Sequence, residues 1–192
     1  MTQAMGVGLE GRRVRLERVR IAHVPALFDM AQTPGWPLAG AGLDMDRFVE
    51  ELWSSSPLQF AVIRQDTDEV IGLVRGQHWD QRSGTIEVVF AIAPSCWRLL
   101  WPFEGAVIFC DYLLRGLGMR KLYFELRPSS LEALGSWVRR RCVREWVKPD
   151  ELRSADGGFE DVEVWSVRDL DYARVDRMLG RSRAGAVGAV GA

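Results

Sequence analysis

The chain has 192 residues, with 25 basic and 26 acidic side chains and a formal net charge of −1. Its 47% hydrophobic and 27% charged residues are typical of one ordinary globular domain, neither disordered nor fibrous. The charge balance excludes a protein that holds DNA by bulk electrostatics. The longest apolar runs fall short of the ~20 residues of a membrane span.

The sequence also indicates a compartment. Its N-terminus lacks the order of charged, apolar and small residues that a signal peptide has. Three scattered cysteines, Cys96, Cys110 and Cys142, lack C-x-x-C spacing, which indicates a reducing environment and no zinc cluster. We therefore expect a cytoplasmic protein that binds no metal, no DNA and no membrane. The oligomeric state stays open.

Hydrophobic periodicity predicts alternating strands and helices between two Gly/Ala-rich ends. Residues 1–8 and 181–192 lack a packing pattern and are predicted to be mobile tails. Strands are predicted at residues 14–19, 59–64, 69–77, 85–93, 121–126 and 160–167. Helices are predicted at residues 22–31, after Asp44, at 104–117, and from a cap at Ser129 or Ser130 to Arg140. The helix after Asp44 carries Phe48, Leu52 and Trp53 on one face. This order predicts a mixed α/β (α+β) domain.

Three segments, LEGRRVRL (9–16), IEVVFAIAP (86–94) and WRLLWPFEGA (97–106), occur in this order along the chain. They resemble the first strand, the fourth strand, and the pyrophosphate loop with its following helix start in the GNAT superfamily of N-acyltransferases. The branch that they resemble includes the ribosomal-protein N-terminal acetyltransferases. The resemblance covers residues 9–169. It implies a single domain over residues 9–170 and a C-terminal extension over residues 171–192. It also implies a mixed, mostly antiparallel sheet of six to seven strands, flanked by helices and splayed between the fourth and fifth strands.

The loop for the donor departs from the family pattern. In this family a turn of the form Q/R-x-x-G-x-G/A presents backbone N–H groups to the cofactor pyrophosphate at the positive end of a helix. Here Arg98 and Leu100 stand at the glycine positions, and Pro102 removes one N–H donor. The resemblance nevertheless implies that the donor is bound by seven residues: Ala91, Ile92, Trp97, Arg98, Leu99, Leu100 and Trp101. Of these, Ala91 and Ile92 are expected to bind the thioester carbonyl through their backbone N–H groups.

Three interpretations of this loop stay open. Acyl-CoA can still bind through its pantetheine arm and the helix dipole. The donor can instead be an acyl-phosphopantetheine on a carrier protein, with Arg98 binding its single phosphate, or an aminoacyl-tRNA. In the third interpretation catalysis is lost and the fold serves as a binding or regulatory module.

A run of arginines bears on this choice. Arg139, Arg140 and Arg141, with Arg144, form either a solvated helix end or a patch that docks an acidic carrier protein or a tRNA acceptor end.

Acyl transfer needs a deprotonated amine, a polarised thioester carbonyl and a proton for the leaving thiolate. The resemblance implies that Glu87 takes the amine proton; the alternative is a strand glutamate that faces solvent or pairs with an arginine. For the thiolate the resemblance implies a hydroxyl on the helix after the fifth strand, which points to Ser129 or Ser130, although both can instead be helix caps.

The acceptor side is expected at the first two helices, their loop and the hairpin end, where Trp36, Trp53, His78 and Trp79 fall. An aromatic lining suits a small planar or apolar amine. The alternative is that Trp53 belongs to the core and Trp36 packs its own loop. The sequence therefore predicts an N-acyltransferase that acts by direct attack on a pantetheine thioester. The remaining alternatives are a catalytically silent GNAT-like module and an aminoacyl-tRNA-dependent transferase.

Overall fold

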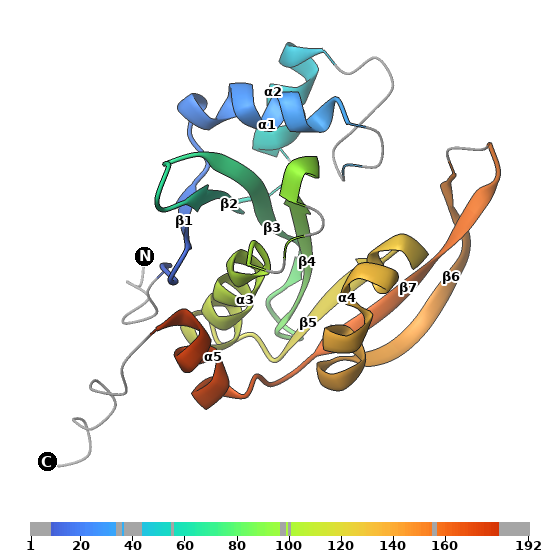
Figure 1. Cartoon of the computed structure of the whole chain (residues 1–192). Coiled ribbons are helices and arrows are strands. Elements are labelled where there is room, and N and C mark those ends of the chain that lie inside the picture. Colours follow the sequence, from blue (N-terminus) through green and yellow to red (C-terminus); the bar gives the residue numbers. More distant parts are fainter. Residues whose placement is uncertain are drawn as a thin grey trace, which may run out of the picture.

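A seven-stranded sheet in the order β1-β2-β3-β4-β5-β7-β6 organises the protein (Figure 1). The computed structural model describes residues 9–33, 36, 44–54, 56–96, 99, 101–154 and 157–180; both predicted tails lie outside these ranges. The strands are β1 Val14–Arg18, β2 Leu58–Arg64, β3 Val70–Asp80, β4 Thr85–Ile92, β5 Lys121–Leu126, β6 Val143–Arg153 and β7 Phe159–Val167. The α-helices are α1 Val24–Ala31, α2 Met45–Ser54, α3 Phe103–Asp111, α4 Pro128–Arg141 and α5 Tyr172–Leu179.

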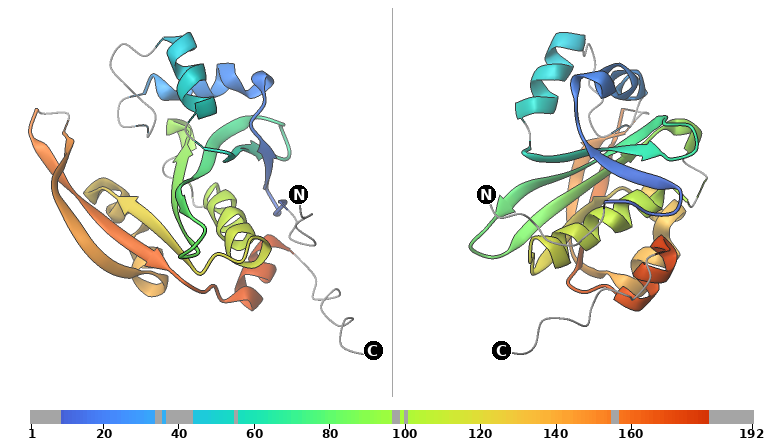
Figure 2. Two further views of the ribbon diagram at one scale, coloured as in Figure 1. Left: turned by 180° about the vertical axis from the view of Figure 1, so that it is seen from behind. Right: turned by 90° about the vertical axis from the view of Figure 1, so that its left-hand side faces the viewer.

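The sheet opens between its two halves. Strands β4 and β5 run parallel, whereas all other neighbours are antiparallel. The β4–β5 pairing extends from Thr85 opposite Lys121 to Glu87 opposite Tyr123, although β4 itself continues to Ile92. Figure 2 shows the β5–β7–β6 half diverging from the β1–β4 half beyond this point. The predicted mixed sheet with a splay between the fourth and fifth strands is confirmed.

Helices cover both faces of the sheet and enclose two apolar clusters. On one face α1 and α2 pack over the β1–β4 half, where Leu27, Phe48 and Leu52 are fully buried against Leu73 and Ala91. On the other face α3, α4 and α5 enclose the larger cluster. Because the side chains of a strand alternate between faces, β4 contributes to both clusters. Glu87 and Ala91 therefore lie on the face covered by α1 and α2.

The helix ends differ in three places from the sequence predictions. Trp53 shares a face of α2 with Phe48 and Leu52, but its side chain is 46% exposed, so the alternative that it belongs to the core is wrong. Helix α4 begins at Pro128, and its N-cap Arg127 forms no capping hydrogen bond through its side chain, so neither Ser129 nor Ser130 is the cap. Proline fits the first turn because its missing N–H would have no partner there. The predicted helix over residues 104–117 ends as a π-helical turn, Tyr112–Gly116.

Helix α5, which follows the predicted domain boundary at residue 170, packs against the rest of the domain. Val175 and Leu179 of α5 are buried in the larger cluster, and Arg115 bridges Asp111 and Asp176. Within the described ranges, none of the helices is long and apolar enough to cross a membrane.

Candidate active site

Glu87 lies where β4 and β5 separate, and both of its carboxylate oxygens are held. Gln77 on β3 donates from Nε2 to Oε1 at 2.6 Å, and the His78 Nδ1 lies 2.8 Å from Oε2. The Glu87 side chain is 13% exposed, whereas that of His78 is 77% exposed. The Glu87 carboxylate is thus largely buried, and its two hydrogen bonds fix its orientation. Of its two partners, His78 is the one that reaches solvent.

A local irregularity of β3 brings His78 to this carboxylate. The pairing of β3 with β4 is regular up to Gln77 opposite Glu87 and shifts before Asp80. Between them His78 has a φ of 50°, in the left-handed region that non-glycine residues rarely adopt. Such strain is retained where the surrounding structure fixes it, and it is frequent at functional sites.

Beside Glu87, the second half of the sheet contributes an aromatic pair. Tyr123 of β5 is opposite Glu87 in the β4–β5 register, and its ring lies 5.7 Å from that of Trp146 on β6. The Lys121 ammonium lies 4.6 Å from the Tyr123 ring and forms an ion pair with Glu145 at 2.6 Å. The charge of Lys121 is therefore neutralised within the sheet, and it keeps the pKa of Glu145 below its usual range.

The backbone of β4 determines which N–H groups face the gap toward β5. Ala93 donates its N–H to Ile71 on β3, and the Ala91 carbonyl approaches Gly72 so closely that a Cβ there would lie 2.3 Å from it. Ala91 and Ala93 thus face β3. By the alternation of a strand, Phe90 and Ile92 face the side on which β5 has diverged. Of the two predicted carbonyl-binding residues, Ile92 is on the side of the gap and Ala91 is not.

The donor loop is only partly described. Trp97, Arg98 and Leu100 lie outside the described residues, and Leu99 is 41% exposed. Trp101 is partly buried, with the Arg64 guanidinium 5.4 Å from the centre of its ring.

The serines expected to protonate the thiolate lie in the first turn of α4. Ser130 is partly exposed there, and the side chain of Ser129 lies outside the described part of the chain.

The four residues predicted for the acceptor side fall into two environments. Trp36 is 3% exposed, packs in the cluster under α1 and α2, and donates its indole N–H to the Ile92 carbonyl at 3.1 Å. Trp53, His78 and Trp79 are exposed. The end of α2 is tied to β3 because Ser56 donates its hydroxyl to the Gly76 carbonyl. This places the end of α2 beside the β3 segment that carries His78 and Trp79.

The predicted arginine patch lies at the end of α4 and the start of β6. Arg139 and Arg140 are exposed in the last turn of α4, and Arg144 pairs with Glu163 at 3.2 Å. The last-turn positions also suit the helix dipole, so the structure is compatible with both interpretations of this run.

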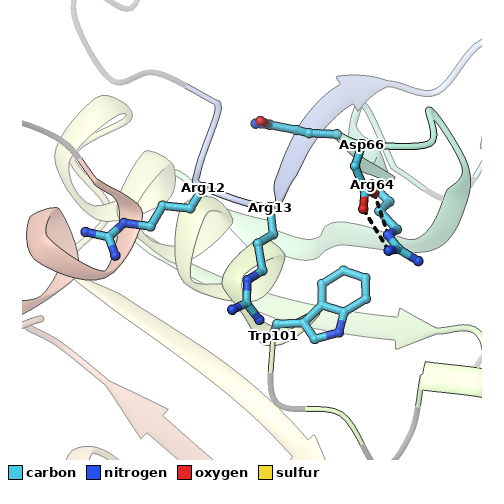
Figure 3. A pocket seen from close by; sticks show the side chains of 6 residues that line it. Arg12, Arg13, Arg64, Asp66 and Trp101 are labelled. Atoms are coloured by element: carbon cyan, nitrogen blue, oxygen red, sulfur yellow. Dashed lines mark hydrogen bonds and ion pairs between the residues drawn. The ribbon is translucent and has the colours of Figure 1, made fainter.

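A second group of side chains was not singled out from the sequence. A cavity of about 500 Å³ lies beside Trp101 (Figure 3) and is lined by Arg12, Arg13, Arg64, Gln65, Asp66 and Trp101. No short motif indicates it, because its members come from three separate parts of the chain. Gln77 was missed for a similar reason, since only the β3–β4 register brings it to Glu87. Over the described ranges, no three His, Cys, Asp or Glu side chains are grouped so as to hold a metal ion.

A mixed sheet that splays at its one parallel strand pair is the architecture of the GNAT fold. The chain belongs to this family: residues 13–132 match the family model described as an acetyltransferase (GNAT) domain. Comparison with curated protein sequences gives no match. Three similar solved structures are acetyltransferases, and because their sequence identities to this chain are all below 25%, they establish the fold alone.

The first is a chimera of spermidine N-acetyltransferase SpeG from Vibrio cholerae and hSSAT, with a TM-score of 0.67 and 16% identity over 88% of this chain and 100% of that one. The second is a GCN5-related N-acetyltransferase from Brucella melitensis, with a TM-score of 0.67 and 22% identity over 88% of this chain and 81% of that one. The third is a GNAT-family acetyltransferase from Bacillus anthracis, with a TM-score of 0.68 and 10% identity over 83% and 97% of the two chains.

Proposed function

We propose that the protein transfers an acyl group from a pantetheine thioester, either acyl-CoA or an acyl carrier protein, to the amine of a small molecule. The amine attacks the thioester directly, and Glu87 is the general base. One observation carries this proposal: Glu87 lies at the point where β4 and β5 separate, with Gln77 and His78 each bound to one of its oxygens. A base that is held in position reduces the cost of orienting it during the reaction.

The proton balance of this reaction follows from the same contacts. The amine nitrogen loses a proton to the Glu87 carboxylate as its C–N bond to the acyl carbon forms. The exposed His78 is bound to the same carboxylate and provides a route by which this proton reaches solvent. We therefore assign His78 to proton release, in addition to its predicted place on the acceptor side.

The thioester is placed in the gap between β4 and β5. There the backbone of β4 beyond Glu87 is our candidate to polarise the thioester carbonyl. When the C–S bond breaks, the leaving thiolate takes a proton from Ser130 or Ser129 in the first turn of α4, or from solvent. The Ser130→Ala and Ser129→Ala variants and the double variant test this assignment, and an unchanged turnover number in the double variant would leave solvent as the proton source.

The acceptor is proposed to be an amine with a planar or apolar body. Tyr123 and Trp146 line the face beside Glu87, and Trp53 and Trp79 are exposed near the end of α2. The carboxylates of Glu125 on β5 and Glu145 on β6 are paired with Lys148 and Lys121, so these two are not available to the amines of a polyamine. This distinguishes the proposed acceptor from the spermidine named for one structural neighbour.

The cellular setting stays part of the proposal. All three cysteines are buried thiols, which supports the proposed reducing cytoplasm. If the donor is a carrier protein, the exposed Arg139 and Arg140 are the proposed docking surface for its acidic face.

Thiol release with a panel of amines tests the function. Purified protein is offered acetyl-CoA, longer acyl-CoAs and an acylated carrier protein, and the free thiol and the acylated amine are quantified together. We expect equal amounts of the two products with a monoamine that carries a ring or an apolar body. Thiol release without acylated amine would contradict direct transfer. Binding of the donors without any turnover would favour the silent module.

A further inference from the structure

The cavity beside Trp101 has the composition of a site for anions. Three arginines line it, Arg12, Arg13 and Arg64, against one carboxylate, that of Asp66. Its volume of about 500 Å³ falls in the range of small-molecule sites. Figure 3 shows the Arg13 and Arg64 side chains on either side of Trp101, whereas Arg12 extends toward α5.

Arg64 is held in place by two neighbours. Its guanidinium pairs with Asp66 at 2.6 Å and stacks over the Trp101 ring at 5.4 Å. The pairing raises the pKa of Arg64 and lowers that of Asp66, so both groups stay charged at neutral pH. A guanidinium has five N–H donors, and a single carboxylate does not use all of them. Arg64 can therefore bind a second anion in an orientation that is already set.

The two other arginines are presented by a fixed piece of backbone. The buried Glu104 in the first turn of α3 accepts the backbone N–H groups of Arg12 and Arg13 through its two oxygens. Gly11 allows this close approach, because a Cβ there would lie 2.2 Å from Glu104 Oε1. The start of β1 is thereby attached to the start of α3, which leaves the side chains of Arg12 and Arg13 out of the contact with Glu104; Figure 3 shows that of Arg13 beside Trp101 and that of Arg12 toward α5.

The cavity lies at the end of the sheet toward which the β4–β5 gap opens. In the strand register Val14 is opposite Arg64, Ile63 opposite Val70, and Gly72 opposite Ile92. The start of β1, the end of β2 and the end of β4 thus lie at the same end of the sheet. Trp101 belongs to the donor loop itself, which follows β4 at this end of the sheet.

We propose that this cavity binds the phosphate groups of a free acyl-CoA donor and so takes over the task that glycine N–H groups cannot perform in this loop. The inference rests on the proposed function. The guanidiniums of Arg13 and Arg64 offer more N–H donors than a single phosphodiester of a carrier protein uses, so they suit the several phosphates of CoA better. Guanidinium forks bind phosphate oxygens in pairs and need no close approach of the backbone. The aromatic ring of Trp101 also suits the nucleoside that carries these phosphates.

Calorimetric titration with adenosine 3′,5′-bisphosphate, the phosphorylated end of CoA, tests the site without any turnover. We compare the wild type with Arg13→Ala, Arg64→Ala and the control Arg82→Ala, an exposed arginine in the turn between β3 and β4 at the opposite end of the sheet. We expect a loss of affinity of about tenfold or more for the first two variants and no change for the control. Affinity should also fall as salt is raised. Thermal unfolding of each variant verifies that it is folded.

Kinetics and further ligands separate the possible outcomes. If the acyl transfer reaction takes place, Arg13→Ala and Arg64→Ala should raise KM for acyl-CoA by a similar factor and leave kcat unchanged. A rise in KM for acyl carrier protein alone would replace CoA by the carrier as the source of the phosphate and overturn the proposal. Unchanged affinity for the bisphosphate in both variants, or equal affinity for inorganic phosphate, would also overturn it. If the wild type binds the bisphosphate but shows no turnover, and the Arg13→Ala and Arg64→Ala variants lose this binding, the result would support the site and refute the proposed function.

Discussion

Removal of the Glu104 carboxylate should destabilise the protein measurably. This side chain is 7% exposed and accepts the backbone N–H groups of Arg12 and Arg13, the second at 3.2 Å. A hydrogen bond to a charged group contributes about 1.5–3 kcal/mol, and the longer of the two bonds is the weaker one. We expect Glu104→Ala to lower the free energy of unfolding by about 3 kcal/mol, which corresponds to a decrease in Tm of about 6–12 °C for a chain of this size.

Denaturant unfolding at neutral pH measures this loss, and Glu104→Gln is the matched control. The glutamine keeps the volume and one carbonyl acceptor, but its amide N–H₂ group faces a backbone N–H, so we expect about half the loss. A change of less than about 0.5 kcal/mol for the alanine variant would refute the reasoning, because a surface substitution without a structural role has an effect of that size. It would also mean that Glu104 does not hold the start of β1.

Three further predictions concern the framework around the site. Gly76→Ala should cost about 1–3 kcal/mol in denaturant unfolding, because the new Cβ would lie 2.4 Å from the buried Ile86 side chain; a neutral effect would mean that Ile86 can shift freely. Phe48→Ala should cost about 3–5 kcal/mol in the same assay, since Phe48 is fully buried under α2; a loss below about 1 kcal/mol would contradict this packing. Burial lowers the pKa of His23 from its ordinary 6.5, so the unfolded chain takes up a proton that the folded chain does not. Stability should therefore fall as the pH drops below about 6.5, and His23→Gln should make Tm less dependent on pH over that interval; equal slopes would show that other groups cause the dependence.

Most strands and helices could be predicted because their side-chain periodicity is set locally, whereas β6, Val143–Arg153, and α5, Tyr172–Leu179, were not placed from the sequence. The strand predicted at residues 121–126 is β5, Lys121–Leu126, and the strand predicted at residues 85–93 is β4, which ends one residue earlier. Local sequence did not specify which way a side chain at a helix end points. Trp53 lies in the last turn of α2 and is exposed, although it shares a face with the buried Phe48 and Leu52.

The partners of the candidate base could not be predicted, because they depend on register. Glu87 was predicted from the family resemblance, but its contact with Gln77 requires the exact β3–β4 pairing. The contact with His78 requires in addition the positive φ of that residue, which follows from the register shift before Asp80. The arginine cavity is harder still to predict, because its residues come from three segments, 12–13, 64–66 and 101, that come together only in the folded protein.

The pH dependence of Glu87→Gln tests the central claim most directly. The initial rate of amine acylation is measured for the wild type, Glu87→Gln and the control Glu69→Gln, an exposed glutamate in the β2–β3 hairpin. If Glu87 removes the amine proton, its loss should lower kcat by about 10²–10⁴-fold near neutral pH. The remaining activity should then rise about tenfold per pH unit toward the pKa of the amine, since only the deprotonated amine reacts without a base. A Glu87→Gln variant with the rate and pH profile of the wild type and of Glu69→Gln would contradict the account.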